Sequence, residues 1–147
     1  MIMPVTDAQV ATLRALLSDD TDHYEQLFGQ LDRAQARSGY TALVTGAFCE
    51  AVERRFGRNY QPADVIAFVG QVRARSERVA KGLDPDVAER VIRVVYGDGS
   101  LADLSDSAVV SAQLVLLGGL IADEQLDAPE LDAFLAGARK LADQLMS

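Results

Sequence analysis

Apolar residues recur every three or four positions along almost the whole chain, and no stretch alternates between apolar and polar residues as a strand would. This spacing places apolar side chains on one face of each successive helix. We therefore expect an all-α fold, a compact bundle of six or seven helices with a central apolar helix at about 106–122. Hydrophobic residues form 49% of the 147 residues. That content suits one hydrophobic core, so we expect a single all-helical domain over 1–147.

Prolines and capping residues divide the apolar pattern into separate helices. Pro62 is expected to open a helix that runs over about 62–81. Asp84 followed by Pro85 forms an N-cap and first-turn pair, which predicts another helix start. The stretch YGDGSLADLSD, residues 96–106, is rich in glycine, aspartate and serine and is expected to be a loop.

The most apolar part of the chain is SAVVSAQLVLLGGLIA, within the expected helix 106–122. Its leucines cover more sides of a helix than one neighbour shields, and Gly118 and Gly119 allow another backbone to approach closely. We therefore expect 112–135 to form the centre of the core and part of a homodimer contact. We do not expect a membrane span, because the run is shorter than the ~20 apolar residues a bilayer needs and contains Gln113.

Charge is unevenly distributed along a chain whose net charge is -8. Residues 51–97 hold nine basic and six acidic residues, whereas both flanks are acidic. Many of these basic residues follow an acidic residue by four positions, the order that favours pairing along a helix. Four basic residues that have no such neighbour form the candidate interaction patch: Arg55, Arg58, Arg75 and Arg78. We do not expect nucleic acid to be a partner, because phosphate binding needs a net positive footprint.

The residues that most often carry catalysis or metal binding are sparse. Cys49 falls on the apolar face of its helix, so we expect it to be buried and inert, and His23 is the chain's one histidine. Loops starting at Asp98 or Asp123 lack the glycine and the acidic twelfth ligand of a calcium-binding EF-hand. We therefore expect no catalytic residue, no metal ligand and no cofactor.

These observations favour a non-enzymatic helical protein–protein interaction module. Its expected partner is another protein or a second copy of the chain, with no membrane partner. The alternatives are a small enzyme whose carboxylate-based site is assembled only by the fold, and a nucleic-acid-binding or metal-binding helical domain. With one cysteine and no apolar leader at the start of the sequence, we expect a cytoplasmic location.

Overall fold

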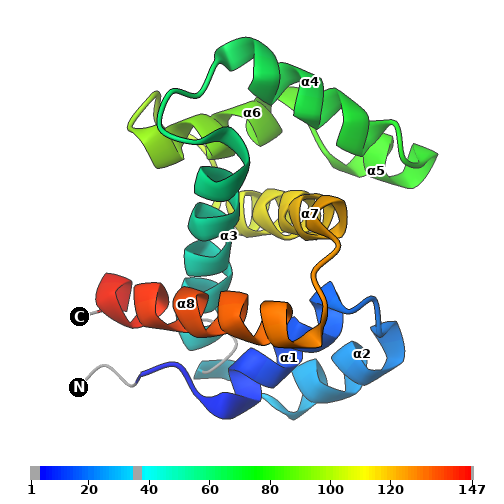
Figure 1. Ribbon diagram of the computed structural model, residues 1–147, viewed down its shortest axis with the longest axis vertical. Helices are drawn as coiled ribbons and strands as arrows, with labels where there is room; N and C mark the ends of the chain where they lie inside the picture. The colour runs from blue at the N-terminus through cyan, green and yellow to red at the C-terminus, as the bar shows by residue number, and fades with distance from the viewer. Residues whose placement is uncertain (1–3, 35–37, 147) are drawn as a thin grey trace. The chain divides into compact units, whose positions relative to one another are not determined.

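The computed structural model describes residues 4–34 and 38–146. Within these residues it contains eight α-helices, one short 3₁₀ helix and no strand, so the all-α prediction is confirmed (Figure 1). The elements are α1 (Asp7–Leu17), α2 (Thr21–Gln30), α3 (Tyr40–Phe56), α4 (Pro62–Arg73), α5 (Glu77–Gly82), α6 (Pro85–Arg93), the 3₁₀ helix η2 (Val94–Tyr96), α7 (Asp106–Glu124) and α8 (Ala128–Met146).

Contacts within the chain group its residues into two compact units. Unit 1 comprises Met1–Glu50 and Ile121–Ser147, and unit 2 comprises Ala51–Leu120. Helices α1, α2 and α8 belong to unit 1, and α4, α5 and α6 belong to unit 2. Residues of α3 and of α7 contribute to both. The single domain over 1–147 stays a prediction.

In unit 1, α1 lies against both α2 and α8 (Figure 1). A reciprocal cap starts α1. The Gln9 backbone N–H donates to Thr6 Oγ1 at 3.2 Å, and the Thr6 N–H donates to Gln9 Oε1 at 2.8 Å. The Gln9 side chain also packs against Gly39, where an added Cβ would lie 2.3 Å from Gln9 Nε2. The core is formed by fully buried side chains on three helices: Leu13, Leu43, Phe48, Phe134 and Leu135.

Helices α3 and α8 approach each other closely at Gly46. A Cβ atom added there would lie 2.8 Å from the Ala138 carbonyl oxygen and 3.1 Å from the Ala142 nitrogen. Ala138 and Ala142 are themselves fully buried, so small residues form this contact on both helices. The segment before α1 is fixed to the far end of α8, because the Val5 N–H donates to Asp143 Oδ1 at 2.8 Å.

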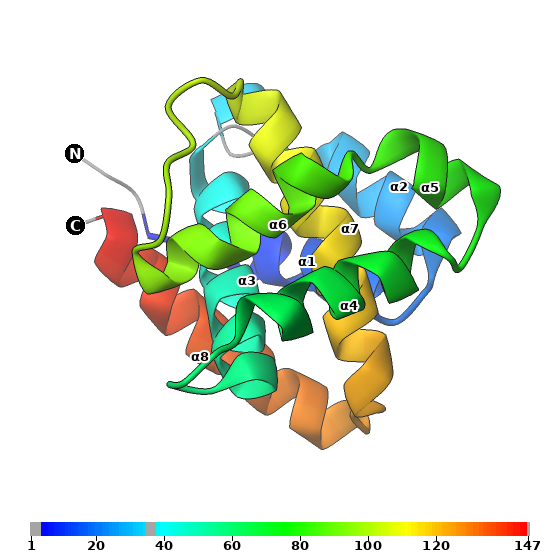
Figure 2. The ribbon, with the colours of Figure 1, turned by 90° about the horizontal axis from the view of Figure 1, so that it is seen from above.

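In unit 2, α4 lies beside α6 (Figure 2). Apolar side chains from α4, α6 and α7 form its core, and each is at most 2% exposed: Val65, Phe68, Val69, Val72, Val91, Ile92, Leu116 and Leu117. Pro62 starts α4, and the Asp84 carboxylate accepts the Val87 N–H at 3.1 Å to cap α6, so both predicted starts are confirmed.

The helix expected over 62–81 is two helices, which raises the total from the expected six or seven to eight. Its interruption has a local cause. The Ser76 Oγ accepts the Val79 N–H at 3.1 Å and so caps a new helix, α5. The guanidinium of Arg73, the last residue of α4, contacts the end of α5. It donates to the carbonyl oxygens of Leu83 and Ala80 at 2.9 Å each. The apolar spacing continues through this break, which conceals it in the sequence.

Helix α7 extends two residues beyond the expected 106–122. It is long and apolar enough to cross a membrane by length and composition alone, and 39% of its apolar window is buried inside the protein. At Gly119 an added Cβ would lie 3.0 Å from Val72 Cγ2, a tight contact, so a glycine favours the close approach to α4. Gly118 has open space around its Cα, so only one of the two glycines serves this contact.

Candidate interaction surfaces

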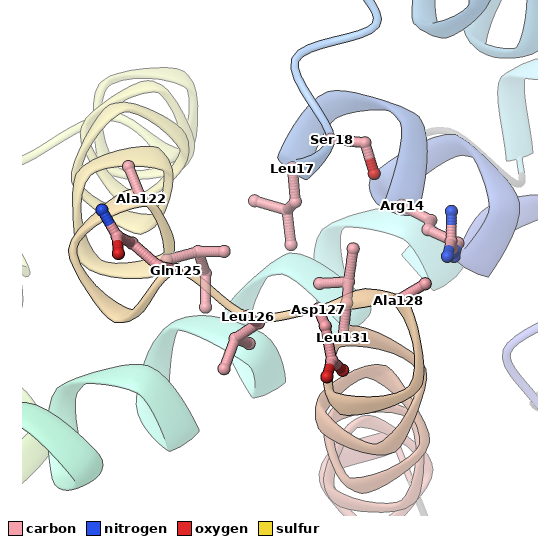
Figure 3. Close-up of a pocket in the computed structure, with 10 residues that line it drawn as sticks. Arg14, Leu17, Ser18, Ala122, Gln125, Leu126, Asp127, Ala128 and Leu131 are labelled. Carbon is pink, nitrogen blue, oxygen red and sulfur yellow. The ribbon is translucent and has the colours of Figure 1, made fainter.

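A hollow of about 360 Å³ lies in unit 1, bordered by the end of α1 and by the turn that joins α7 to α8 (Figure 3). We call it the α1–α8 hollow. Its lining residues are Arg14, Leu17, Ser18, Ile121, Ala122, Gln125, Leu126, Asp127, Ala128 and Leu131. Its volume is near the lower end of the range of about 300–1,000 Å³ found for small ligand sites, and it suits one large side chain.

The floor of the α1–α8 hollow is apolar. Ile121 is 5% exposed and Leu131 is 6% exposed, and Leu17 and Leu126 are half-buried. Figure 3 shows Leu17 extending from α1 into the space that Leu126 and Leu131 border from the other side. An apolar group that entered this space would therefore meet apolar atoms from two directions.

The rim of the α1–α8 hollow is polar and is held by local interactions. Arg14 Nε donates to Asp132 Oδ1 at 2.7 Å. Asp127 and Glu130 form a reciprocal cap for α8: the Glu130 N–H donates to Asp127 Oδ1 at 2.8 Å, and the Asp127 N–H donates to Glu130 Oε1 at 3.0 Å. Gln125 adopts a left-handed backbone conformation, with φ of 52°, which turns the chain between the helices. Hydrogen bonds within the protein thus hold the rim residues.

Part of the α1–α8 hollow falls inside the segment 112–135, for which a homodimer contact was expected. The sequence did not indicate the contribution of α1. Leu17 and Ser18 lie more than 100 positions from Ile121, and no local pattern records which helix end faces which. Only the tertiary packing of α1 against α8 brings the two segments together.

The four arginines of the candidate interaction patch lie in unit 2, and the structure brings two of them to one aromatic ring. The Arg55 guanidinium carbon lies 5.1 Å from the centre of the Phe68 ring, within the range of a cation–π interaction. Arg75 Nη1 and Phe68 Cζ both border the space above Gly119, at 3.3 and 3.6 Å from an added Cβ. Arg55 thus lies against the Phe68 ring, and Arg75 lies near the same space as the tip of that ring.

Arg58 and Arg78 are exposed and come before and after α4 in the chain. The helix that separates them in the chain, α4, has 12 residues and is therefore about 18 Å long, at about 1.5 Å per residue. Arg55 also lines a second, smaller hollow of about 260 Å³, which includes Asp64, whose carboxylate offsets the positive charge. The binding of a partner by these four arginines stays a prediction.

A polar cluster in unit 2 was not indicated by the sequence. The Tyr60 hydroxyl donates to Asp98 Oδ2 at 2.5 Å, and Arg93 Nε donates to the same oxygen at 3.1 Å. These hydrogen bonds, the one from Tyr60 first, hold the pKa of Asp98 below its ordinary value. The hydrogen bond to Asp98 raises the pKa of Tyr60. The Tyr60 ring stacks on Tyr96 with centroids 4.2 Å apart, so the cluster ties the loop after η2 to the turn before α4.

Cys49 is only partly buried, whereas its apolar neighbours Phe48 and Val52 are at most 1% exposed. Its place at the edge of the apolar face of α3, rather than in its centre, corrects the expectation that it is fully buried. His23 occupies the first turn of α2, where its Nδ1 lies 3.6 Å from Asp20 Oδ2. Across residues 4–34 and 38–146, no group of three or more histidine, cysteine, aspartate or glutamate side chains is arranged to hold a metal ion.

Comparison with known proteins adds no family: no protein-family model, no curated protein and no solved structure matches this chain.

Proposed function

We propose that this protein is a non-enzymatic, cytoplasmic helical module that binds another protein. The observation that carries the proposal is the α1–α8 hollow, with its apolar floor and its ordered polar rim. Burying a leucine or phenylalanine side chain there would contribute about 1.5–3 kcal/mol. The rim residues Arg14 and Gln125 offer donors to the backbone carbonyls that flank such a side chain.

A small enzyme with a carboxylate-based site is the competing function. Such a site needs acids aimed at a substrate. Among the residues that line the α1–α8 hollow, the one carboxylate belongs to Asp127, and it accepts a backbone N–H at the start of α8. Its position favours a structural role and supports the binding module over the enzyme.

Self-association is a second form of the same function, favoured by one face of α7. Ser111, Val115 and Gly118 form an exposed stripe on this helix, and Val115 is 38% exposed. Residues on the opposite face, including Leu116 and Leu117, are fully buried. A second copy that covered the stripe through a two-fold contact would produce the homodimer expected from the sequence.

Site-specific photo-cross-linking tests whether the α1–α8 hollow binds another protein. A benzophenone amino acid replaces Ser18 at the edge of the α1–α8 hollow, and in a control protein it replaces the exposed Asp86 on α6. We expect irradiation of intact cells to give a discrete protein adduct, identified by mass spectrometry, from position 18 alone. The same adducts from both positions, or none from position 18, would contradict the proposal.

A further inference from the structure

Helix α2 carries an apolar face that its own unit leaves partly open. None of its ten residues is buried. Tyr24 and Leu27 are half-buried and Phe28 is 40% exposed, and their spacing of three and four residues places them on one face. We call these three residues the α2 face. A helix of this length depends on tertiary packing for its stability. Its open apolar face can therefore bury further apolar area against a partner.

The α2 face is held in a defined shape by ring contacts. The centroids of Tyr24 and Phe28 lie 5.8 Å apart, and those of Phe28 and Tyr40 lie 5.7 Å apart in an edge-to-face arrangement. Tyr40 is 3% exposed, so the Phe28 ring contacts the core of unit 1 while 40% of Phe28 stays exposed. A rigid aromatic anchor loses little conformational entropy on binding.

Acidic side chains lie at the start of α2 and beside Phe28. Glu25 precedes Phe28 by three positions and therefore lies beside it on the helix. Asp19, Asp20 and Asp22 are exposed at the start of α2. Basic side chains nearby in the described sequence are fewer: Arg33 is exposed beyond the end of α2, and His23 lies beside Asp20. A partner that covers Phe28 must therefore also meet a negative field.

We propose that the α2 face binds a basic amphipathic helix of a partner protein. Its apolar residues would cover Tyr24, Leu27 and Phe28, and its lysines and arginines would face Glu25 and the aspartates at the start of α2. This is helix-to-surface recognition in which charge complementarity selects the partner. No residue of α2 lines the α1–α8 hollow, so this second surface does not depend on it.

The test uses a synthetic helical peptide of about 18 residues, or about five turns, made of leucine and lysine at amphipathic spacing with one tryptophan. The protein contains no tryptophan, so the fluorescence of the peptide reports binding directly. We expect saturable binding that weakens as salt is added. Replacing Phe28 by serine should reduce the affinity about tenfold or more, as expected for an aromatic anchor. The matched control Ile66→Ser, at an apolar side chain 55% exposed on α4, should leave it unchanged.

Charge reversal gives a second, independent readout should Phe28→Ser fail to fold. Glu25→Lys should weaken peptide binding, whereas Glu53→Lys, an equal charge change at an exposed position of α3, should not. Equal binding of a peptide with glutamate in place of lysine would overturn the proposal, as would equal affinity of the Glu25 and Glu53 variants. A dimer without peptide that Phe28→Ser dissociates would also overturn it, because a second copy would then occupy the face. Ala128→Phe, which fills the α1–α8 hollow without adding a tryptophan, should leave peptide binding intact.

Discussion

The hydroxyl of Tyr60 donates a hydrogen bond of 2.5 Å to the carboxylate of Asp98, a residue 38 positions later in the chain. This bond lowers the pKa of Asp98 and raises the pKa of Tyr60. A depressed folded-state pKa stabilises the protein above the ordinary aspartate value of about 3.9, and this stability is lost as the pH falls through the folded pKa. The raised pKa of Tyr60 acts in the opposite sense: its contribution is present below about pH 10 and is lost as the pH rises through the folded pKa.

Removing the hydroxyl should therefore shift the titration of Asp98. In Tyr60→Phe we expect the pKa of Asp98 to move up toward its ordinary value, because the largest cause of its depression is gone, although Arg93 still holds it below that value. Carboxyl-detected NMR titration measures the change. Tyr96→Phe keeps the hydrogen bond between Tyr60 and Asp98 and serves as the control. An unchanged Asp98 titration in Tyr60→Phe would contradict the assignment.

Gly46→Ala should destabilise the contact between α3 and α8. The added methyl group would lie 2.8 Å from the backbone oxygen of Ala138, which cannot move aside without shifting α8. We expect a loss of about 1–3 kcal/mol, typical of overpacking a core. Gly29→Ala is the matched control, because nothing lies within 4 Å of its added Cβ, and it should stabilise α2 by about 0.5–1 kcal/mol. Urea unfolding of both variants decides the matter; equal effects of the two would refute the close approach.

Arg73→Ala should loosen α5 specifically. The guanidinium donates to two carbonyl oxygens at the end of this short helix, those of Ala80 and Leu83. A hydrogen bond to a charged group is worth about 1.5–3 kcal/mol, so we expect amide exchange in α5 to quicken by about tenfold or more. Hydrogen exchange measured by NMR tests this, with Arg78→Ala in the same helix as the control. Exchange rates in α5 that match the wild type would show that Arg73 does not hold it.

Two aspartate substitutions on α7 separate core from interface. Leu117 is fully buried, so Leu117→Asp places an unpaired charge in the core and should unfold the protein. Val115 is 38% exposed, so Val115→Asp should stay folded. If the α7 stripe joins two copies, light scattering of the wild type at high micromolar concentration gives twice the chain mass of 15.8 kDa, and Val115→Asp gives the single mass. A wild type that remains monomeric at that concentration would remove the homodimer.

The parts of the fold that local chemistry decides were predictable from the sequence. Pro62 and the Asp84–Pro85 pair mark helix starts because a missing N–H and a capping carboxylate act within one turn. The break between α4 and α5 was missed although Ser76 is a good capping residue, because the apolar spacing runs on to Val79. Helix periodicity assigns a face to Cys49 only approximately, and its partial exposure depends on where the neighbouring helices end.

The candidate surfaces depend on contacts between residues distant in sequence. Leu17 and Leu131 meet across the α1–α8 hollow only because α1 packs on α8, and Tyr60 reaches Asp98 only when the loop after η2 folds back. The arginine patch shows the same limit. The sequence provides its four members, but only the packing of the helices places Arg55 against the Phe68 ring and Arg75 beside Gly119.

Filling the α1–α8 hollow tests the central claim most directly. Ala128 lines the hollow and is exposed, and Ala133 is exposed on the same helix but lies outside it. With the photo-cross-linker at position 18, the account predicts that Ala128→Trp abolishes the protein adduct while Ala133→Trp retains it. Both variants should have the same midpoint of urea unfolding as the wild type. An adduct of undiminished yield in Ala128→Trp would contradict a binding function for the hollow.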